Sequence, residues 1–324
     1  MNTHRLVILL AVLLGLAPSS HVAADDTPGG SVHTLQRPGL VLSYTDRGAG
    51  EPVLLLMGGP GVASVGLDPV AAMIAKSARA IVPDQRGSGR SIPTDPAAIT
   101  LDGTLSDFEA LRAELGLERW TVWGCSWGGM LAMDYAAKFP GSVKALVLVG
   151  SGGTSWASFR SAFGDNMAAR MSADDRAAIE YWSRPEVKVR DPELAVAEAM
   201  RARLPSQFFD RGKAFPALAL FQPGREHYNP QAGALLIPAF EADAATRVEA
   251  LRRLTIPALI IHGRQDPMPE AVALANHELL QKSRLVWLDR CGHWPWLEQP
   301  DALEKTTAEF LTELSATLQP AHSR

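Results

Sequence analysis

Residues 120–130, with the sequence WTVWGCSWGGM, decide the fold of this chain. The apolar run at 120–123 has the length and the aromatic, β-branched composition of a buried strand. Residues 128–139 follow with a helix-like pattern that ends before a proline. The chain must therefore turn within residues 124–128, and the glycines at both ends of that segment remove side chains that would collide in so tight a turn.

Ser126 stands at the centre of this turn, in the pattern Gly124-Cys125-Ser126-Trp127-Gly128. Between a strand and a helix, G-x-S-x-G is typical of the nucleophile elbow, which holds a serine hydroxyl clear of the backbone. The amides at the start of the following helix would favour negative charge that develops beside it. An isolated G-x-S-x-G also fits a plain Gly-Ser loop, but the flanking strand and helix favour the elbow. We therefore expect Ser126 to be a nucleophile.

Apolar, strand-like runs alternate with helix-like segments along much of the chain. This alternation predicts a mostly parallel sheet with helices on both faces, and the elbow makes it an α/β fold of the α/β-hydrolase type. Helices are expected at 105–115 and at 301–318, where apolar residues form one stripe. The expected strands are 53–57, 79–82, 120–123, 143–149, 258–261 and 285–288.

The stretch from 151 to 253 interrupts the alternation. It contains several prolines and three helical patterns but no convincing buried strand. We expect an inserted helical cap that covers the strand ends, where ligands bind in such folds. The helical patterns are at 174–182, 192–203 and 242–254, and the expected division is a core of 25–150 and 254–324 with a cap of 151–253.

The first 24 residues have the layout of a secretory signal. A basic residue, Arg5, precedes the apolar run Leu6–Leu16, and small residues ending at Ala24 form an A-x-A-like cleavage site. The apolar run is shorter than the ~20 residues that a membrane anchor requires. We expect an exported protein, periplasmic or secreted, without stable membrane insertion.

Charge and cysteine content set further limits. The net charge is −4 and no run of Lys and Arg stands out, so no nucleic-acid partner is expected. The chain has two cysteines, Cys125 and Cys291, and an even count in an exported protein permits a disulfide. Each also fits a small buried residue with a free thiol, and we favour the free thiols.

A serine hydroxyl needs a base to take its proton, and the base needs a third group to orient it. In α/β-hydrolases the acid and then the histidine follow the serine along the chain. Asp266 and His293 each follow an expected strand in that order, so we expect them to complete a triad with Ser126. His277-Glu278 does not continue to a second histidine, because position 281 is Gln, and no metal site is expected.

The loop after the strand 53–57 is rich in glycine, with Met57-Gly58-Gly59-Pro60-Gly61. In this position backbone amides form the oxyanion hole, together with the amide that follows the nucleophile. We expect the amides of Gly59 and Trp127 in this role, with Gly58 as the alternative and as a substrate contact. Without the elbow, the same loop would fit a plain Gly-Pro turn.

Three segments together resemble the proline iminopeptidase family of serine peptidases: GGPG at 58–61, DQRGSGRS at 84–91 and GCSWG at 124–128. The family carries H-G-G-P-G, D-Q-R-G-x-G-x-S and G-G-S-W-G in these places. The likeness covers most of residues 50–150 and 255–295. It implies a serine hydrolase with a helical cap and no cofactor. It also implies release of an N-terminal residue, often proline, from peptides.

The chain departs from the family at two of these motifs. Met57 replaces the histidine that opens the oxyanion loop, and Cys125 replaces a glycine. In the family, acidic cap residues bind the free α-amine of the substrate. The segment Arg225-Glu226-His227-Tyr228 resembles the family's E-N-H-Y, which makes Glu226 a candidate for that role. An ordinary surface carboxylate is the other interpretation of Glu226.

Other functions fit parts of the same pattern. His293-Trp294-Pro295-Trp296 is also similar to capped esterases and lactonases, and Trp294 is a candidate wall of a substrate pocket with Trp127 and Trp296. Epoxide hydrolases and dehalogenases of this fold use a carboxylate nucleophile, so Ser126 argues against them. The alternatives are therefore an esterase or lactonase for small acyl substrates, and a non-catalytic ligand-binding homologue.

Overall fold

The computed structural model describes residues 30–317, so the expected signal segment 1–24 lies outside the described residues. Eight strands form one sheet in the order β1-β2-β4-β3-β5-β6-β7-β8. β2 is antiparallel to both of its neighbours, and all other neighbouring pairs are parallel. The strands are β1 (Ser31–Arg37), β2 (Leu40–Gly48), β3 (Pro52–Leu56), β4 (Arg79–Pro83), β5 (Trp120–Cys125), β6 (Val143–Val149), β7 (Ala258–Gly263) and β8 (Ser283–Leu288).

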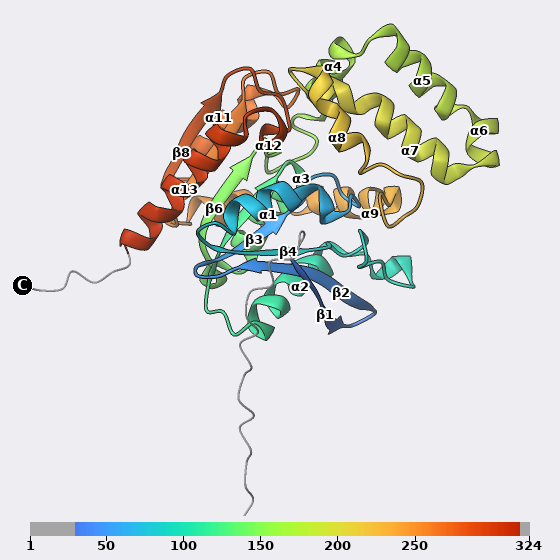
Figure 1. Cartoon of the computed structure of the whole chain (residues 1–324). Helices are drawn as coiled ribbons and strands as arrows, with labels where there is room; N and C mark the ends of the chain where they lie inside the picture. The colour runs from blue at the N-terminus through green and yellow to red at the C-terminus, as the bar shows by residue number, and fades with distance from the viewer. Residues whose placement is uncertain (1–29, 318–324) are drawn as a thin grey trace, which may run out of the picture.

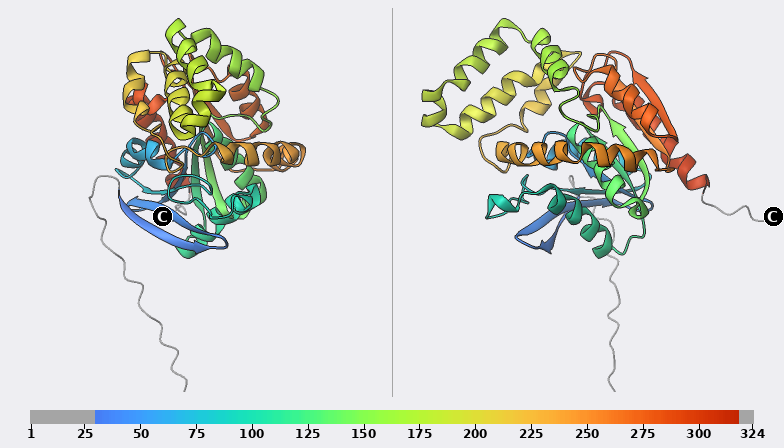
Figure 2. Two further views of the ribbon diagram at one scale, coloured as in Figure 1. Left: turned by 90° about the vertical axis from the view of Figure 1, so that its right-hand side faces the viewer. Right: turned by 180° about the vertical axis from the view of Figure 1, so that it is seen from behind.

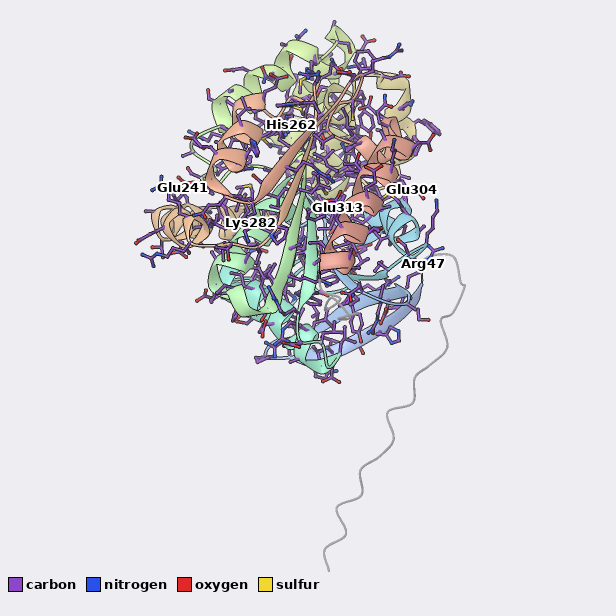
Figure 3. All side chains as sticks on the ribbon, turned by 90° about the vertical axis from the view of Figure 1, so that its left-hand side faces the viewer. Arg47, Glu241, His262, Lys282, Glu304 and Glu313 are labelled. Carbon is purple, nitrogen blue, oxygen red and sulfur yellow. The ribbon has the colours of Figure 1, made fainter. Side chains whose placement is uncertain are left out.

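Two apolar cores lie on opposite faces of the sheet. Successive residues of a strand point to opposite faces, so Leu54 belongs to one core and Leu55 to the other. α2 (Leu101–Glu114), α3 (Trp127–Lys138) and α11 (Glu270–Leu279) cover the first core, and α1 (Asp68–Ile74) and α13 (Pro300–Thr317) cover the second. Figure 3 shows Glu304 and Glu313 of α13 on one side of the molecule and Glu241 on the other. Burial on both faces explains the unbroken apolar runs of the central strands.

Residues 151–253 contain helices and no strand. Figure 1 shows α4–α8 stacked together beyond the sheet, and Figure 2 shows α9 and the following helix at a lower level, alongside the sheet domain. α10 contacts α3 and α11, so this helix packs on the sheet domain. The helices are α4 (Arg160–Arg170), α5 (Ala173–Ser183), α6 (Pro185–Arg190), α7 (Pro192–Arg203), α8 (Phe215–Leu218), α9 (Pro230–Ala242) and α10 (Ala244–Arg252).

The α/β-hydrolase fold and all six expected strands are confirmed, with ends shifted by at most two residues. The hairpin of β1 and β2 was not expected from the sequence. The helix expected at 242–254 begins two residues later, because α9 ends at Ala242 and Asp243 caps both helices. No helix within residues 30–317 is long and apolar enough to cross a membrane. Shorter helical segments are η1 (Ser64–Leu67), η2 (Pro96–Ala98), η3 (Pro140–Ser142), η4 (Leu204–Gln207), η5 (Arg211–Ala214) and α12 (Pro295–Glu298).

Candidate active site

Ser126 lies in a strained turn between β5 and α3. Its φ of 50° and ψ of −117° are angles that residues other than glycine rarely adopt. The turn depends on its glycines: a Cβ on Gly124 would lie 2.3 Å from the carbonyl oxygen of Gly128, and one on Gly128 would lie 2.0 Å from that of Leu56. The Ser126 amide donates to the carbonyl of Val149 at the end of β6, 3.1 Å away. The neighbouring strand therefore holds the turn in place.

Asp266 and His293 meet at the ends of β7 and β8. His293 Nδ1 lies 2.8 Å and 2.9 Å from the two carboxylate oxygens of Asp266. The Met268 amide donates to Asp266 Oδ1 at 2.7 Å, which fixes the carboxylate. Gly150 passes so close that a Cβ there would lie 2.9 Å from Asp266 Oδ2 and 3.3 Å from His293 Nδ1. Because the Asp266 carboxylate contacts Nδ1, Nε2 is the ring nitrogen of His293 that can accept a proton.

The glycine loop after β3 lies against the turn. A Cβ on Gly58 would lie 2.8 Å from Ser126 Cβ, and Gly59 has a φ of 72°, which glycine adopts without strain. Gln85 donates through Nε2 to the carbonyl of Met57 at 2.8 Å and fixes the start of the loop. Within residues 30–317, neither the Gly59 amide nor the Trp127 amide donates to a protein acceptor. Both are therefore free to donate to an oxyanion.

Ser126 and His293 line one cavity of about 150 Å³, and residues of the expected cap, 151–253, line it as well. Among the described residues that line it, none is Asp, Glu, Lys or Arg. Methionine and aromatic side chains dominate the wall, and the three tryptophans expected there are among them. The lining includes Met57, Gly58, Gly59, Met130, Met200, Met268, Trp127, Trp156, Trp294, Trp296, Phe163 and Phe221. Such a wall suits an apolar group next to the reacting carbonyl.

Glu226 does not line this cavity. It lines a separate cavity between the cap and the start of the sheet, with Asp68, Asp84 and Arg90. Its side chain is 64% exposed, with His227 Nε2 3.9 Å from Oε1. The structure thus brings together Ser126, Asp266, His293, the glycine loop and the tryptophans, but leaves Glu226 apart.

Both cysteines are buried free thiols. Burial raises the pKa of the Cys125 thiol to about 12, and burial together with the charge of Glu298 raises the pKa of Cys291. Neither thiol is therefore activated as a nucleophile at neutral pH, although Cys125 lines the cavity beside Ser126. Residues 30–317 contain no group of three or more His, Cys, Asp or Glu side chains arranged to hold a metal ion.

Three residues that hold the site together were not predicted from the sequence. Gln207 lines the cavity and accepts from the His293 amide, and Glu298 accepts from the Gly292 amide. Asn229, which is 1% exposed, donates to the carbonyls of Gly61 and Gly87. Two of the three come from the cap, where local sequence gives no sign of which loop faces the sheet.

The chain is similar to known proteins in sequence and in fold. The family model described as "alpha/beta hydrolase fold" matches residues 51–300, well over half of the chain. The chain belongs to the α/β-hydrolase family. Within this family its resemblance to proline iminopeptidases is confirmed. A proline iminopeptidase of Xanthomonas citri is 30% identical over 319 residues, which cover 87% of this chain and 96% of that relative.

Two further relatives widen the range of activities among similar α/β-hydrolases. A probable proline iminopeptidase of Streptomyces coelicolor is 46% identical, but over 112 residues that cover 31% of this chain and 33% of the relative. The 2-hydroxymuconate semialdehyde hydrolase of Pseudomonas sp. strain CF600 is 28% identical over 86% of this chain and 93% of its own length. Relatives with comparable sequence identity to this chain therefore include proteins named as peptidases and proteins named as other hydrolases.

Solved structures show the same α/β-hydrolase fold. A meta-cleavage product hydrolase from Pseudomonas fluorescens IP01 aligns with a TM-score of 0.68 at 24% identity, over 87% of this chain and 97% of its own. A proline iminopeptidase from Mycobacterium smegmatis aligns with a TM-score of 0.64 at 21% identity, over 89% and 99% of the two chains. At these identities the likeness concerns the fold alone.

Proposed function

We propose that this α/β-hydrolase is a serine hydrolase that cleaves esters with a small, uncharged, apolar acyl group. Ser126 is its nucleophile, His293 its base and Asp266 the group that orients the base. We infer the substrate class from the cavity around Ser126, whose described lining has no Asp, Glu, Lys or Arg side chain.

The absence of a carboxylate from this lining favours an ester over a peptide with a free N-terminus. An α-ammonium group buried beside Met130, Trp127 and Phe163 would lose its hydration without gaining an opposite charge, which costs several kcal/mol. Glu226, the acid expected to bind such an amine, lines another cavity and is mostly exposed. An apolar acyl chain gains stability from the same wall.

The proposed mechanism is acyl transfer in two steps. His293 Nε2 takes the proton of the Ser126 hydroxyl as its oxygen attacks the substrate carbonyl. The amides of Gly59 and Trp127 stabilise the oxyanion, and His293 then protonates the leaving alcohol. A water molecule, deprotonated by His293, releases the acid. Asp266 keeps the proton on Nδ1 and stabilises the imidazolium through the contacts at 2.8 and 2.9 Å.

Two matched substrates test the ester assignment. Propionyl naphthylamide and alanyl naphthylamide differ by the α-amine alone, and p-nitrophenyl butyrate reports esterase activity. We expect turnover of the butyrate and no preference for the free amine. Ser126→Ala should lower the esterase kcat at least about 10⁴-fold, whereas Ser315→Ala on α13 should leave it unchanged. A fluorophosphonate that fails to label Ser126 would refute the serine mechanism and favour the non-catalytic homologue.

A proline iminopeptidase is the second candidate, favoured by the 30% identity to the Xanthomonas citri relative. It would share the proposed triad and oxyanion hole, but it would need a carboxylate near the substrate amine. A strong preference for prolyl or alanyl naphthylamide over the propionyl compound would decide for this candidate and against the ester hydrolase.

We also propose that the chain is exported. Its first 24 residues have the layout of a cleaved signal, and the proposed chemistry needs no cytoplasmic cofactor. Mass spectrometry of the protein from periplasmic and culture fractions tests this. We expect a mature chain that begins at Asp25; a full-length chain confined to the cytoplasm would contradict it.

A further inference from the structure

A segment of the cap, residues 207–210, is docked on the loop that carries His293. The His293 amide donates to the carbonyl of Gln207 at 2.7 Å. Trp294 donates through Nε1 to the side-chain oxygen of Gln207, also at 2.7 Å. One cap residue therefore binds the backbone of the proposed catalytic histidine and the side chain of the residue next to it.

The contact is close and buried. Gln207 approaches Gly292 so tightly that a Cβ there would lie 2.3 Å from the Gln207 carbonyl oxygen. The ring of Phe208 stacks on Trp294, with 5.8 Å between ring centres and 10° between planes. Both rings are nearly fully buried, at 3% and 5% exposure. Movement of the segment away from the loop would expose both rings to water, which is unfavourable.

Glu298 fastens the same segment from the other side. Its carboxylate accepts from the Gly292 amide at 2.6 Å and from the Asp210 amide at 2.9 Å, so it joins the histidine loop to the cap. Lys213 donates to the backbone carbonyl of Glu298 at 2.9 Å. The loop of His293 is thus held between Asp266 on the sheet and residues 207–210 of the cap.

We propose that Gln207 is a positioning residue for His293, so that the histidine is correctly placed only while residues 207–210 are docked. This inference rests on the proposed role of His293. The side-chain bond to Trp294 fixes the direction of the loop, and the backbone bond fixes the His293 amide. The cap then does more than enclose the substrate: its docked position is part of the catalytic geometry.

A double-mutant cycle tests the side-chain bond. Gln207→Met removes the acceptor and retains the length of the side chain, while Trp294→Phe removes the donor and retains a ring. We expect each change to lower kcat for p-nitrophenyl butyrate about 3- to 10-fold, more than it changes KM. Because both remove one bond, the double variant should lose about as much as either single variant.

Gln222→Met is the matched control, since Gln222 is an exposed cap glutamine whose side chain, within residues 30–317, bonds to its own turn. It should leave kcat unchanged. Multiplicative losses in the double variant, or a rise in KM with kcat unchanged, would overturn the proposal and leave Gln207 as a wall residue. If Gln207→Met does not fold, as judged by circular dichroism, the kcat of Trp294→Phe decides in its place.

Fluorophosphonate labelling separates this inference from the proposed function. In the unmodified protein, failure to label Ser126 would defeat the proposed function itself. If the unmodified protein is labelled, we expect Gln207→Met to be labelled about 3- to 10-fold more slowly, because His293 must take the same serine proton. Labelling of Gln207→Met at the unmodified rate would defeat the positioning role alone.

Discussion

Ser126 carries backbone angles that cost a non-glycine residue of the order of 1–3 kcal/mol, and its neighbours must supply that energy. They do so by close packing of backbone on backbone. Gly128 lies against the carbonyl of Leu56, and Gly124 lies against Gly128 itself. The two glycines of the motif thus bring β3, β5 and α3 together at one point, where Ser126 meets the glycine loop after β3.

Gly128→Ala tests this packing. The added Cβ would lie 2.0 Å from the Leu56 carbonyl oxygen, so β3 and the start of the glycine loop must shift. We expect a loss of about 3 kcal/mol in the free energy of urea unfolding, together with a large fall in kcat. Gly141→Ala is the control, because a Cβ there meets nothing within 4 Å. Equal stability of the two variants would show that the elbow tolerates a side chain.

The two cysteines are expected to be unreactive in the folded protein. Burial raises the pKa of Cys125 to about 12 and raises that of Cys291, so both thiols stay protonated in the folded protein at pH 8. We expect Ellman's reagent to react with neither thiol in native protein and with both in guanidinium chloride. Because the folded pKa values are raised, stability should fall as pH rises above about 9, the ordinary thiol value. Rapid reaction of one thiol in the native state would contradict the buried assignment.

Glu241 of α9 holds one wall of the cavity in place. Its carboxylate accepts from the Ser155 hydroxyl at 2.7 Å and from the Ala157 amide at 3.2 Å, on either side of the cavity residue Trp156. Burial alone would raise the pKa of Glu241, but these hydrogen bonds lower it below the usual value. At pH values above the ordinary pKa of glutamate, the ionised carboxylate of Glu241 therefore holds the loop 155–157 in place. This stabilisation is lost as the pH falls through the lowered pKa that Glu241 has in the folded protein.

Glu241→Gln should loosen the loop 155–157 at all pH values. The carboxylate accepts from Ser155 and Ala157 through its two oxygens, whereas a glutamine side chain has one acceptor oxygen. We expect KM for p-nitrophenyl butyrate to rise about 3- to 10-fold, with a smaller change in kcat. The unmodified protein should approach the same KM as acid protonates Glu241. Glu249→Gln on α10, at an exposed position, is the control. An unchanged KM in Glu241→Gln would exclude a role of this carboxylate in the cavity wall.

The sequence predicts some strands and site residues well and others poorly. The buried strands β3–β7 are visible as apolar runs because both faces are covered. β1 instead alternates half-buried and exposed residues, and its run SVHTLQR contains few apolar side chains, so no such run marks it. The grouping of Ser126, Asp266 and His293 was predictable because each of them follows a strand at the same edge of the sheet. Gln207 and Asn229 were not, because their roles depend on how cap loops dock on the sheet.

The most discriminating part of the resemblance is the octet at 84–91, whose side chains bond to other parts of the fold. Among the described residues that line the cavity beside Ser126, none comes from this octet. Asp84 accepts from the hydroxyl of Ser64, and Arg86 makes two bonds to Asp107 of α2. The octet ties the oxyanion loop and α2 to the sheet, so it indicates how the chain folds and says little about its substrate.

Asp107 shows how strongly the molecule depends on this network. It is fully buried, and it accepts from Arg86 at 2.8 Å and from Arg37 of β1 at 3.0 Å. Asp107→Asn would leave two arginines facing a neutral amide, one of them almost fully buried. Removing one partner of a buried ion pair costs about 3–5 kcal/mol.

We therefore expect Asp107→Asn to lose about 3–5 kcal/mol in urea unfolding, yet to retain near-normal kcat wherever it remains folded. Asp102→Asn, on the same helix, is the matched control: its side chain is 82% exposed and pairs with Lys138 at the surface, so its loss should stay within about 0.5 kcal/mol. If Asp107→Asn instead kept its stability and lost kcat, the octet and its partners would belong to the catalytic machinery. The comparison thus separates a motif that specifies the fold from one that specifies the reaction.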